Sequence, residues 1–353
     1  MAKPGRNAGS APSGAVAGSR MSQERRTYAA LDLGTNNCRL LVARPNGDGF
    51  RVVDAFSRIV RLGEGLGGSR RLKEAAIART IDALQVCRTK MEARGVTRAR
   101  LIATEACRAA ENGAEFIQRV REEALLDLEV VDRETEAHLA VAGCAALADP
   151  HAEGAILFDI GGGSSELAWL TGAARDRRSL RQRVRAWTSL PVGVVTLAER
   201  HGGVHVDREG FEGMVAEVLG LISEFAQEVG SARRCQRFHL LGTSGTVTTI
   251  AGVHLGLKRY DRRQVDGVWM QDGDVTDVME RLLGMSFDER AANPCIGNER
   301  ADLVLAGCAI LEAIRRTFPA GRLRIADRGL REGILMQLMD EDGVWAPGRR
   351  PNA

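Results

Sequence analysis

The 353-residue chain has few aromatic residues, which make up only 4% of it. Its interior must therefore consist mostly of Ala, Leu, Val and Ile, and the total hydrophobic fraction of 44% is ordinary for a globular protein. The absence of any run of about 18 apolar residues excludes a predicted membrane span. The first 26 residues lack the apolar segment of a signal peptide, and their Ala, Gly, Ser and Pro content predicts a disordered basic tail.

Paired cysteine motifs are also absent. The seven cysteines are widely spaced and include no Cys-x-x-Cys pair. This pattern indicates neither a zinc knuckle nor a disulfide framework, and it favours a reducing, cytoplasmic location. The net charge of +3 is too small to indicate a nucleic-acid-binding protein by itself. Arginine nevertheless greatly outnumbers lysine, which indicates either phosphate recognition or only the codon usage of a GC-rich genome.

One pattern of strands occurs twice along the chain. Each copy has a buried strand, a tight turn and two further strands, at Tyr28–Leu33, Cys38–Arg44 and Phe50–Ser57 and again at Gly154–Ile160, Ser164–Leu170 and Val184–Leu190. Other strands are predicted at Arg100–Thr104, Leu128–Val131, Phe238–Leu241 and Leu323–Ala326. Helices are predicted at Leu72–Arg94, Ala114–Leu125, Glu134–Leu147, Phe211–Val229, Val247–Leu255, Arg300–Thr317 and Leu330–Met339. The repeat predicts two α/β lobes, 27–139 and 140–341, before a frayed tail over 342–353.

An Asp ends the first strand of each copy, before a polar loop with glycine. The first loop is Asp32-Leu33-Gly34-Thr35-Asn36-Asn37, whose N–H groups and short polar side chains suit an anion, although Asn and Gly also favour an ordinary turn. The second loop is Asp159-Ile160-Gly161-Gly162-Gly163-Ser164-Ser165-Glu166. Its three glycines indicate close approach to the backbone, or else a flexible hairpin. Asp159 and Glu166 are oxygen ligands suited to Mg²⁺.

A third loop, Gly242-Thr243-Ser244-Gly245-Thr246, lies between a predicted strand and a predicted helix. The N–H groups of a helix start and the hydroxyl groups bind phosphate well. Ser244 or Thr246 would also serve as an ordinary helix N-cap, and the two roles are compatible. Two facing lobes would bring all three loops and both Asp residues around one cleft, which predicts a phosphate clamp.

With these motifs in this order, residues 27–340 resemble the exopolyphosphatase/guanosine pentaphosphate phosphatase (Ppx/GppA) family of the actin-like phosphotransferase superfamily. Other landmarks of the resemblance are Arg61-Leu62-Gly63-Glu64-Gly65-Leu66, Ala103-Thr104-Glu105-Ala106-Cys107-Arg108, Glu134-Thr135-Glu136-Ala137, Ser189-Leu190-Pro191-Val192-Gly193 and Leu330-Arg331-Glu332-Gly333. The resemblance implies two RNase H-like (actin-like ATPase) lobes with an interlobe cleft, in the short form that lacks a further helical domain.

The resemblance also implies roles for particular residues. Glu136 would activate the attacking water, and its place in the first turn of a predicted helix supports an anionic base. Without the resemblance, the favoured interpretation of Glu136 is an acidic residue in the first turn of a helix with no catalytic role. Asp32, Asp159 and Glu166 are implied as Mg²⁺ ligands. Arg108 is implied to grip a phosphate oxygen, and Asn112 to share that role.

The implied reaction is hydrolysis of terminal orthophosphate from inorganic polyphosphate. Guanosine pentaphosphate is the nearest alternative substrate, because it also presents a terminal phosphoanhydride. Asn37, Cys38, His138 and Arg328 depart from the family pattern and leave substrate preference open. A non-catalytic alarmone or polyphosphate sensor is the alternative from another class, against which Glu136 counts. A sugar or acetate kinase of the same superfamily lacks support from any second-substrate segment. The resemblance allows a homodimer.

Two other features have a structural interpretation beside a functional one. His201 and His205 have the spacing of zinc ligands on a helix, but Gly202-Gly203 between them predicts a loop. The six arginines within Arg175–Arg185 indicate either a solvated hairpin or a surface strip that holds a polyanion.

Overall fold

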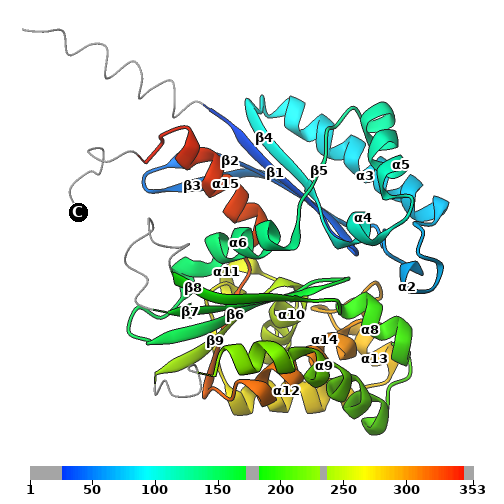
Figure 1. The fold of residues 1–353 in the computed structure, drawn as a ribbon, viewed down its shortest axis with the longest axis vertical. Coiled ribbons are helices and arrows are strands. Elements are labelled where there is room, and N and C mark those ends of the chain that lie inside the picture. Colours follow the sequence, from blue (N-terminus) through cyan, green and yellow to red (C-terminus); the bar gives the residue numbers. More distant parts are fainter. Residues whose placement is uncertain (1–25, 172–182, 231–236, 346–353) are drawn as a thin grey trace, which may run out of the picture.

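A computed structural model of the chain describes residues 26–171, 183–230 and 237–345. Two α/β lobes lie one above the other, and each is built around one mixed sheet (Figure 1). The predicted basic tail up to residue 25, most of the arginine-rich segment and residues 346–353 lie outside the described residues. No helix within the described ranges is both long and apolar enough to cross a membrane.

The first lobe has a five-stranded sheet in the order β3-β2-β1-β4-β5. Its strands are β1 (Tyr28–Leu33), β2 (Asn37–Asn46), β3 (Gly49–Ile59), β4 (Arg98–Ala103) and β5 (Glu129–Val130). Its helices are α2 (Leu66–Ser69), α3 (Glu74–Ala93), α4 (Glu105–Ala109) and α5 (Gly113–Arg119), the last continued by a π-helical turn at Val120–Ala124. β1, β2 and β3 run antiparallel, whereas β4 and β5 are parallel to β1.

The second lobe repeats this arrangement in a six-stranded sheet of order β10-β11-β9-β6-β7-β8. Its strands are β6 (Gly154–Ile160), β7 (Ser165–Thr171), β8 (Val184–Leu190), β9 (Phe238–Thr243), β10 (Trp269–Gln271) and β11 (Arg322–Ala326). Its helices are α8 (Val194–His201), α9 (Arg208–Glu228), α10 (Ser244–His254), α11 (Arg262–Val265), α12 (Asp272–Gly284), α13 (Phe287–Ala292) and α14 (Val304–Thr317). Pairing directions match those of the first lobe, so the internal repeat is confirmed.

The first strand of each lobe is buried on both faces because helices and the other lobe cover the sheets. In β1, only Asp32 is not fully buried, and in β6 only Asp159 is not. An acidic residue in an otherwise apolar core strand costs free energy unless something compensates its charge. The fold therefore places one such Asp at the end of each central strand, where the two lobes meet.

Two helices lie between the lobes, α6 (Arg133–Cys144) and α15 (Leu330–Glu341). The predicted boundary between residues 139 and 140 falls inside α6. The sequence places the last helix in the second lobe, but α15 packs against α6, β1 and β2 and shares an apolar cluster with first-lobe strands. Gly143 and Gly333 allow α6 and α15 to touch, since a Cβ on either would collide with a backbone carbonyl of the facing segment.

The chain stays ordered beyond α15. The Tyr28 hydroxyl donates to Asp342 at 2.8 Å, and Val344 and Trp345 pack beside the apolar cluster between α15 and the first sheet. The first four residues of the predicted tail, 342–345, thus include residues that contact the first lobe. His201 also differs from its prediction as a loop residue, because it ends α8 and lies 2.7 Å from Glu217.

Candidate active site at the lobe junction

The hairpins that carry the two Asp residues share one geometry. Asp32 on β1 lies directly opposite Arg39 on β2, and Asp159 on β6 lies directly opposite Glu166 on β7. Directly paired residues of an antiparallel ladder project on the same face. The first lobe thus presents an acid beside a guanidinium, whereas the second presents two acids.

The first and second loops touch each other across the junction. A Cβ on Gly162 would lie 3.0 Å from Thr35 Cβ, and one on Gly163 would lie 2.6 Å from Thr35 Oγ1. A larger residue at Gly162 or Gly163 would therefore require the facing loop to shift. The sequence predicts that these glycines admit a ligand, but in the structure the group that approaches them is the loop of the other lobe.

The carboxylates Asp32, Asp159, Glu166 and Glu136 interact across this junction. Burial raises the pKa of Asp32, and burial followed by the charge of Asp32 raises the pKa of Asp159 to about 6. Burial and the charge of Asp159 raise the pKa of Glu166 to about 7. The pKa of Glu136 is also raised, first by burial and then by Glu166. The carboxylates of both lobes therefore interact with one another, and nearby positive charge does not fully neutralise them.

Glu136 lies in the first turn of α6, which the Asp132 side chain caps by accepting from the Thr135 N–H at 2.7 Å. Its Oε2 is buried and forms an ion pair with Arg108 Nη2 at 2.8 Å. The same guanidinium also donates to Glu105 and to the Val131 carbonyl. The charge of Arg108 acts to lower the pKa of Glu136, against the effect of burial.

Arg108 is thus already engaged by protein groups. Its prediction as a phosphate-binding residue remains a prediction, and phosphate binding would compete with Glu105 and Glu136 for its donors. Asn112 does not join it. The Asn112 amide accepts from the Leu72 N–H at 2.8 Å and donates to the Leu72 carbonyl at 3.1 Å, so it holds the chain before α3.

The third loop connects to the second through Asp159. Ser244 begins α10 with φ of 81°, a left-handed conformation that is uncommon for a residue with a side chain. Its hydroxyl interacts with Asp159 and lowers the pKa of that carboxyl. Thr243 is the N-cap residue but makes no side-chain cap; its hydroxyl donates to the Arg328 carbonyl at 2.5 Å. The alternative that Ser244 or Thr246 caps the helix is therefore wrong.

Several predicted phosphate-binding groups are used elsewhere. The Gly34 N–H donates to the Asn37 carbonyl, and the Gly161 N–H donates to the Ser164 carbonyl. The Ser165 hydroxyl donates to the Val192 carbonyl at 2.7 Å. Other loop members are less committed: Asn36 and Asn37 each have a buried side-chain oxygen without a partner among the described residues. No described atom lies near the Cβ position of Gly245.

Thr246 is buried and faces Gly307 of α14, so its side chain takes part in helix packing. Gly242 is similarly enclosed by Phe158 and Val247. These two members of the third loop support its shape, whereas Thr243 and Ser244 reach the junction.

Sequence reasoning missed residues that support the site. Ser189 donates to Glu166 at 2.8 Å, and Glu105 holds both Arg108 and Arg133. Ser189 and Glu105 lie inside motifs that carried the family resemblance, and this was the only signal for them. The motif that begins at Arg61 also joins the two lobes, because the Arg61 guanidinium pairs with both oxygens of Asp302 at 3.0 Å.

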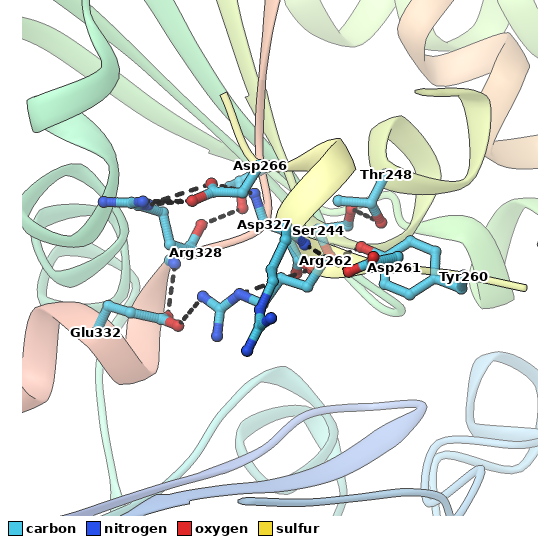
Figure 2. A network of polar contacts seen from close by, with 12 residues as sticks. Ser244, Thr248, Tyr260, Asp261, Arg262, Asp266, Asp327, Arg328 and Glu332 are labelled. Atoms are coloured by element: carbon cyan, nitrogen blue, oxygen red, sulfur yellow. Dashed lines mark hydrogen bonds and ion pairs between the residues drawn. The ribbon is translucent and has the colours of Figure 1, made fainter. Parts of the chain in front are cut away.

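A further polar network lies around the start of α15 (Figure 2). Arg262 donates to Glu332 at 2.6 Å, and the Tyr260 hydroxyl donates to Asp327 at 2.6 Å. Arg328 pairs with Asp266. These contacts fix the segment that enters α15 against the second lobe.

The fold and the junction define a duplicated, two-lobed α/β protein whose acidic hairpins and polar loops converge between the lobes. The model of the Ppx/GppA phosphatase family matches residues 41–342, so the chain belongs to this family. Exopolyphosphatase 2 of Mycobacterium tuberculosis is 29% identical to it over 340 residues, which cover 88% of this chain and 98% of that protein.

Solved structures agree with this assignment. The Ppx/GppA family member of Aquifex aeolicus is 27% identical, with a TM-score of 0.70 and coverage of 90% of this chain and 98% of that one. An exopolyphosphatase from Cytophaga hutchinsonii has a TM-score of 0.80 at 22% identity, with coverage of 90% and 98%, and supports the fold alone. The expected family and two-lobe fold are confirmed.

Proposed function

We propose that the protein is an exopolyphosphatase that hydrolyses terminal orthophosphate from inorganic polyphosphate. The observation that carries this proposal is the convergence of Glu136 with the acidic hairpins of both lobes, where its buried carboxylate forms an ion pair with Arg108. Membership of the Ppx/GppA family and the similarity to Exopolyphosphatase 2 support the substrate class.

In the proposed reaction, Glu136 is the general base. Water attacks the terminal phosphorus while Glu136 accepts the water proton, and the bond to the next phosphate breaks with its electron pair on the shortened chain. A raised pKa makes the deprotonated carboxylate a stronger base, which suits its role in accepting the water proton. The nearby Arg108 charge favours the carboxylate form that the first step needs.

The residues at the junction fit a Mg²⁺ ion, with Asp159 and Glu166 as direct ligands and Asp32 nearby. They are hard oxygen donors, and their raised pKa values indicate negative charge that a cation would offset. Among the described residues, no three His, Cys, Asp or Glu side chains are close enough to hold a metal by themselves. Mg²⁺ commonly uses one or two carboxylates with water and phosphate oxygens. When bound, it would neutralise charge on the phosphate oxygens.

Release of orthophosphate from long polyphosphate, guanosine pentaphosphate and ATP, measured side by side with Mg²⁺ and with EDTA, tests the proposal. We expect Mg²⁺-dependent release, fastest from polyphosphate. Faster release from guanosine pentaphosphate would make that alternative the substrate. Binding of either compound without release would support the sensor instead and would overturn the proposed hydrolase.

A further inference from the structure

Arg331 is the second residue of α15, and it lies where the central strand of the first lobe meets the second lobe. α15 packs against β1 of the first lobe. Gly329, the residue just before α15, faces the second lobe: a Cβ on it would lie 3.3 Å from Thr243 Oγ1 and 3.9 Å from Asp159 Oδ2. The Arg331 guanidinium is near enough to Asp32, Arg39 and Glu332 to interact electrostatically with each.

Two charged residues of the same segment, Glu332 and Arg328, already have partners. Glu332 accepts from the Gly329 N–H at 2.9 Å and from Arg262 at 2.6 Å. Arg328 pairs with Asp266. Arg331 itself makes neither a hydrogen bond nor an ion pair with any residue that the structure describes, and Asp32 pairs with neither Arg39 nor Arg331 within those ranges.

Arg331 is partly buried, so its guanidinium loses part of its hydration while no carboxylate pairs with it, and this costs free energy. Burial acts to lower the pKa of Arg331, and the like charge of Arg39 acts in the same direction. An anion between these arginines would relieve both costs. Phosphate oxygens fit best, since a guanidinium donates two parallel N–H groups to them.

We propose that Arg331 is a substrate-binding residue, whose guanidinium receives phosphate oxygens of the polyphosphate chain at the lobe junction. The inference rests on the proposed function for the identity of the anion. It differs from the role implied for Arg108, whose donors Glu105 and the Val131 carbonyl occupy. Unlike Arg108, Arg331 donates no hydrogen bond to any residue that the structure describes, so its donors are available to an incoming phosphate.

The test measures tripolyphosphate binding by calorimetry in the Glu136→Gln protein, which separates binding from turnover. Arg331→Gln in this background should weaken affinity at least about tenfold, the scale of a lost charge-assisted hydrogen bond. Arg331→Lys should restore part of it, since a point charge remains without the planar fork. Arg328→Gln is the matched control: it removes the same charge from the same segment, but from an ion pair with Asp266.

We expect Arg328→Gln to lower thermal stability and to change the affinity less than about threefold. Equal affinity losses in both variants would mean that only net charge matters, and unchanged affinity in Arg331→Gln would exclude contact with the anion; either result overturns the inference. The wild-type protein separates the two proposals. If tripolyphosphate binds through Arg331 but the wild-type protein releases no orthophosphate, the proposed hydrolase activity is refuted and the role of Arg331 is not. If the wild-type protein releases orthophosphate and Arg331→Gln has the same KM, the role of Arg331 is refuted and the hydrolase activity is not.

Discussion

The two lobes share a hairpin but differ in the residue that faces its Asp. In the first lobe this residue is Arg39, and in the second it is Glu166. Because the backbone pairing is the same, the difference arises from the side chains alone. The first hairpin brings positive charge toward the junction, and the second brings a second acid whose pKa is raised to about 7. The repeat thus provides one surface suited to an anion and one suited to a cation.

Loss of the base should have the largest effect. Glu136→Gln keeps the size and burial of the side chain but removes proton acceptance, so kcat should fall at least about 10²-fold. Polyphosphate binding should persist, because the loops and arginines are unchanged. Steady-state kinetics and a binding assay check both parts. Near-normal turnover would exclude Glu136 as the base, and the exposed Glu134→Gln in the same turn is the matched control.

The acidic hairpin should determine the requirement for metal. Asp159→Asn removes one of two facing carboxylates, so the Mg²⁺ concentration for half-maximal phosphate release should rise about tenfold or more. A Mg²⁺ titration of the initial rate measures this change. Full activity of EDTA-treated wild-type protein would contradict the metal role of both Asp159 and Glu166.

Arg108 should act on the pH profile. Since its charge lowers the pKa of Glu136, Arg108→Gln should raise that pKa further and keep the base protonated over a wider range. The acid limb of kcat/KM should therefore move to higher pH, and activity should partly recover as pH rises. A loss that is uniform across the pH range would indicate instead that Arg108 acts by gripping phosphate.

A smaller effect is expected on stability. The pKa of Glu166 is raised from its ordinary value of 4.5 to about 7, so its stabilising contribution is complete below pH 4.5 and is lost as pH rises through about 7. Glu166→Gln should stabilise the metal-free protein at pH 8 by about 1–3 kcal/mol and at pH 5 by much less.

Urea unfolding with EDTA at both pH values measures this difference, and Glu224→Gln, on an exposed face of α9, is the control. Destabilisation of Glu166→Gln at pH 8 would mean that the hydrogen bond from Ser189 outweighs the burial of the charge.

Most strands of this fold could be predicted from the sequence, because they are apolar segments that become buried. Buried apolar runs that end in Asp32 and Asp159 predicted both hairpins, and each predicted strand lies within a few residues of its observed bounds. Two helices, α8 and α12, were not predicted, because the residues at their starts have low intrinsic helix propensity. α8 begins with Val194, Val195 and Thr196, which favour strands, and α12 begins with Asp and Gly, which are poor helix formers.

The return of α15 to the first lobe was not visible in the sequence, because helical periodicity does not say which sheet an apolar face will cover. The site was visible in part. The loops and Glu136 stand in recognisable motifs, whereas the engagement of Arg108 by Glu105 and the lack of a partner for Arg331 among the described residues depend on how the folded chain arranges its charges.

One measurement tests the contrast between the two hairpins most directly. Orthophosphate release from polyphosphate is measured for Arg39→Gln and Glu166→Gln, with Mg²⁺ titrated at several substrate concentrations. We predict that Arg39→Gln raises KM for polyphosphate and leaves the Mg²⁺ requirement near that of wild type. Glu166→Gln should raise the Mg²⁺ requirement and lower kcat with a smaller change in KM. The same pattern of losses in both variants would contradict a division of anion and cation binding between the two lobes.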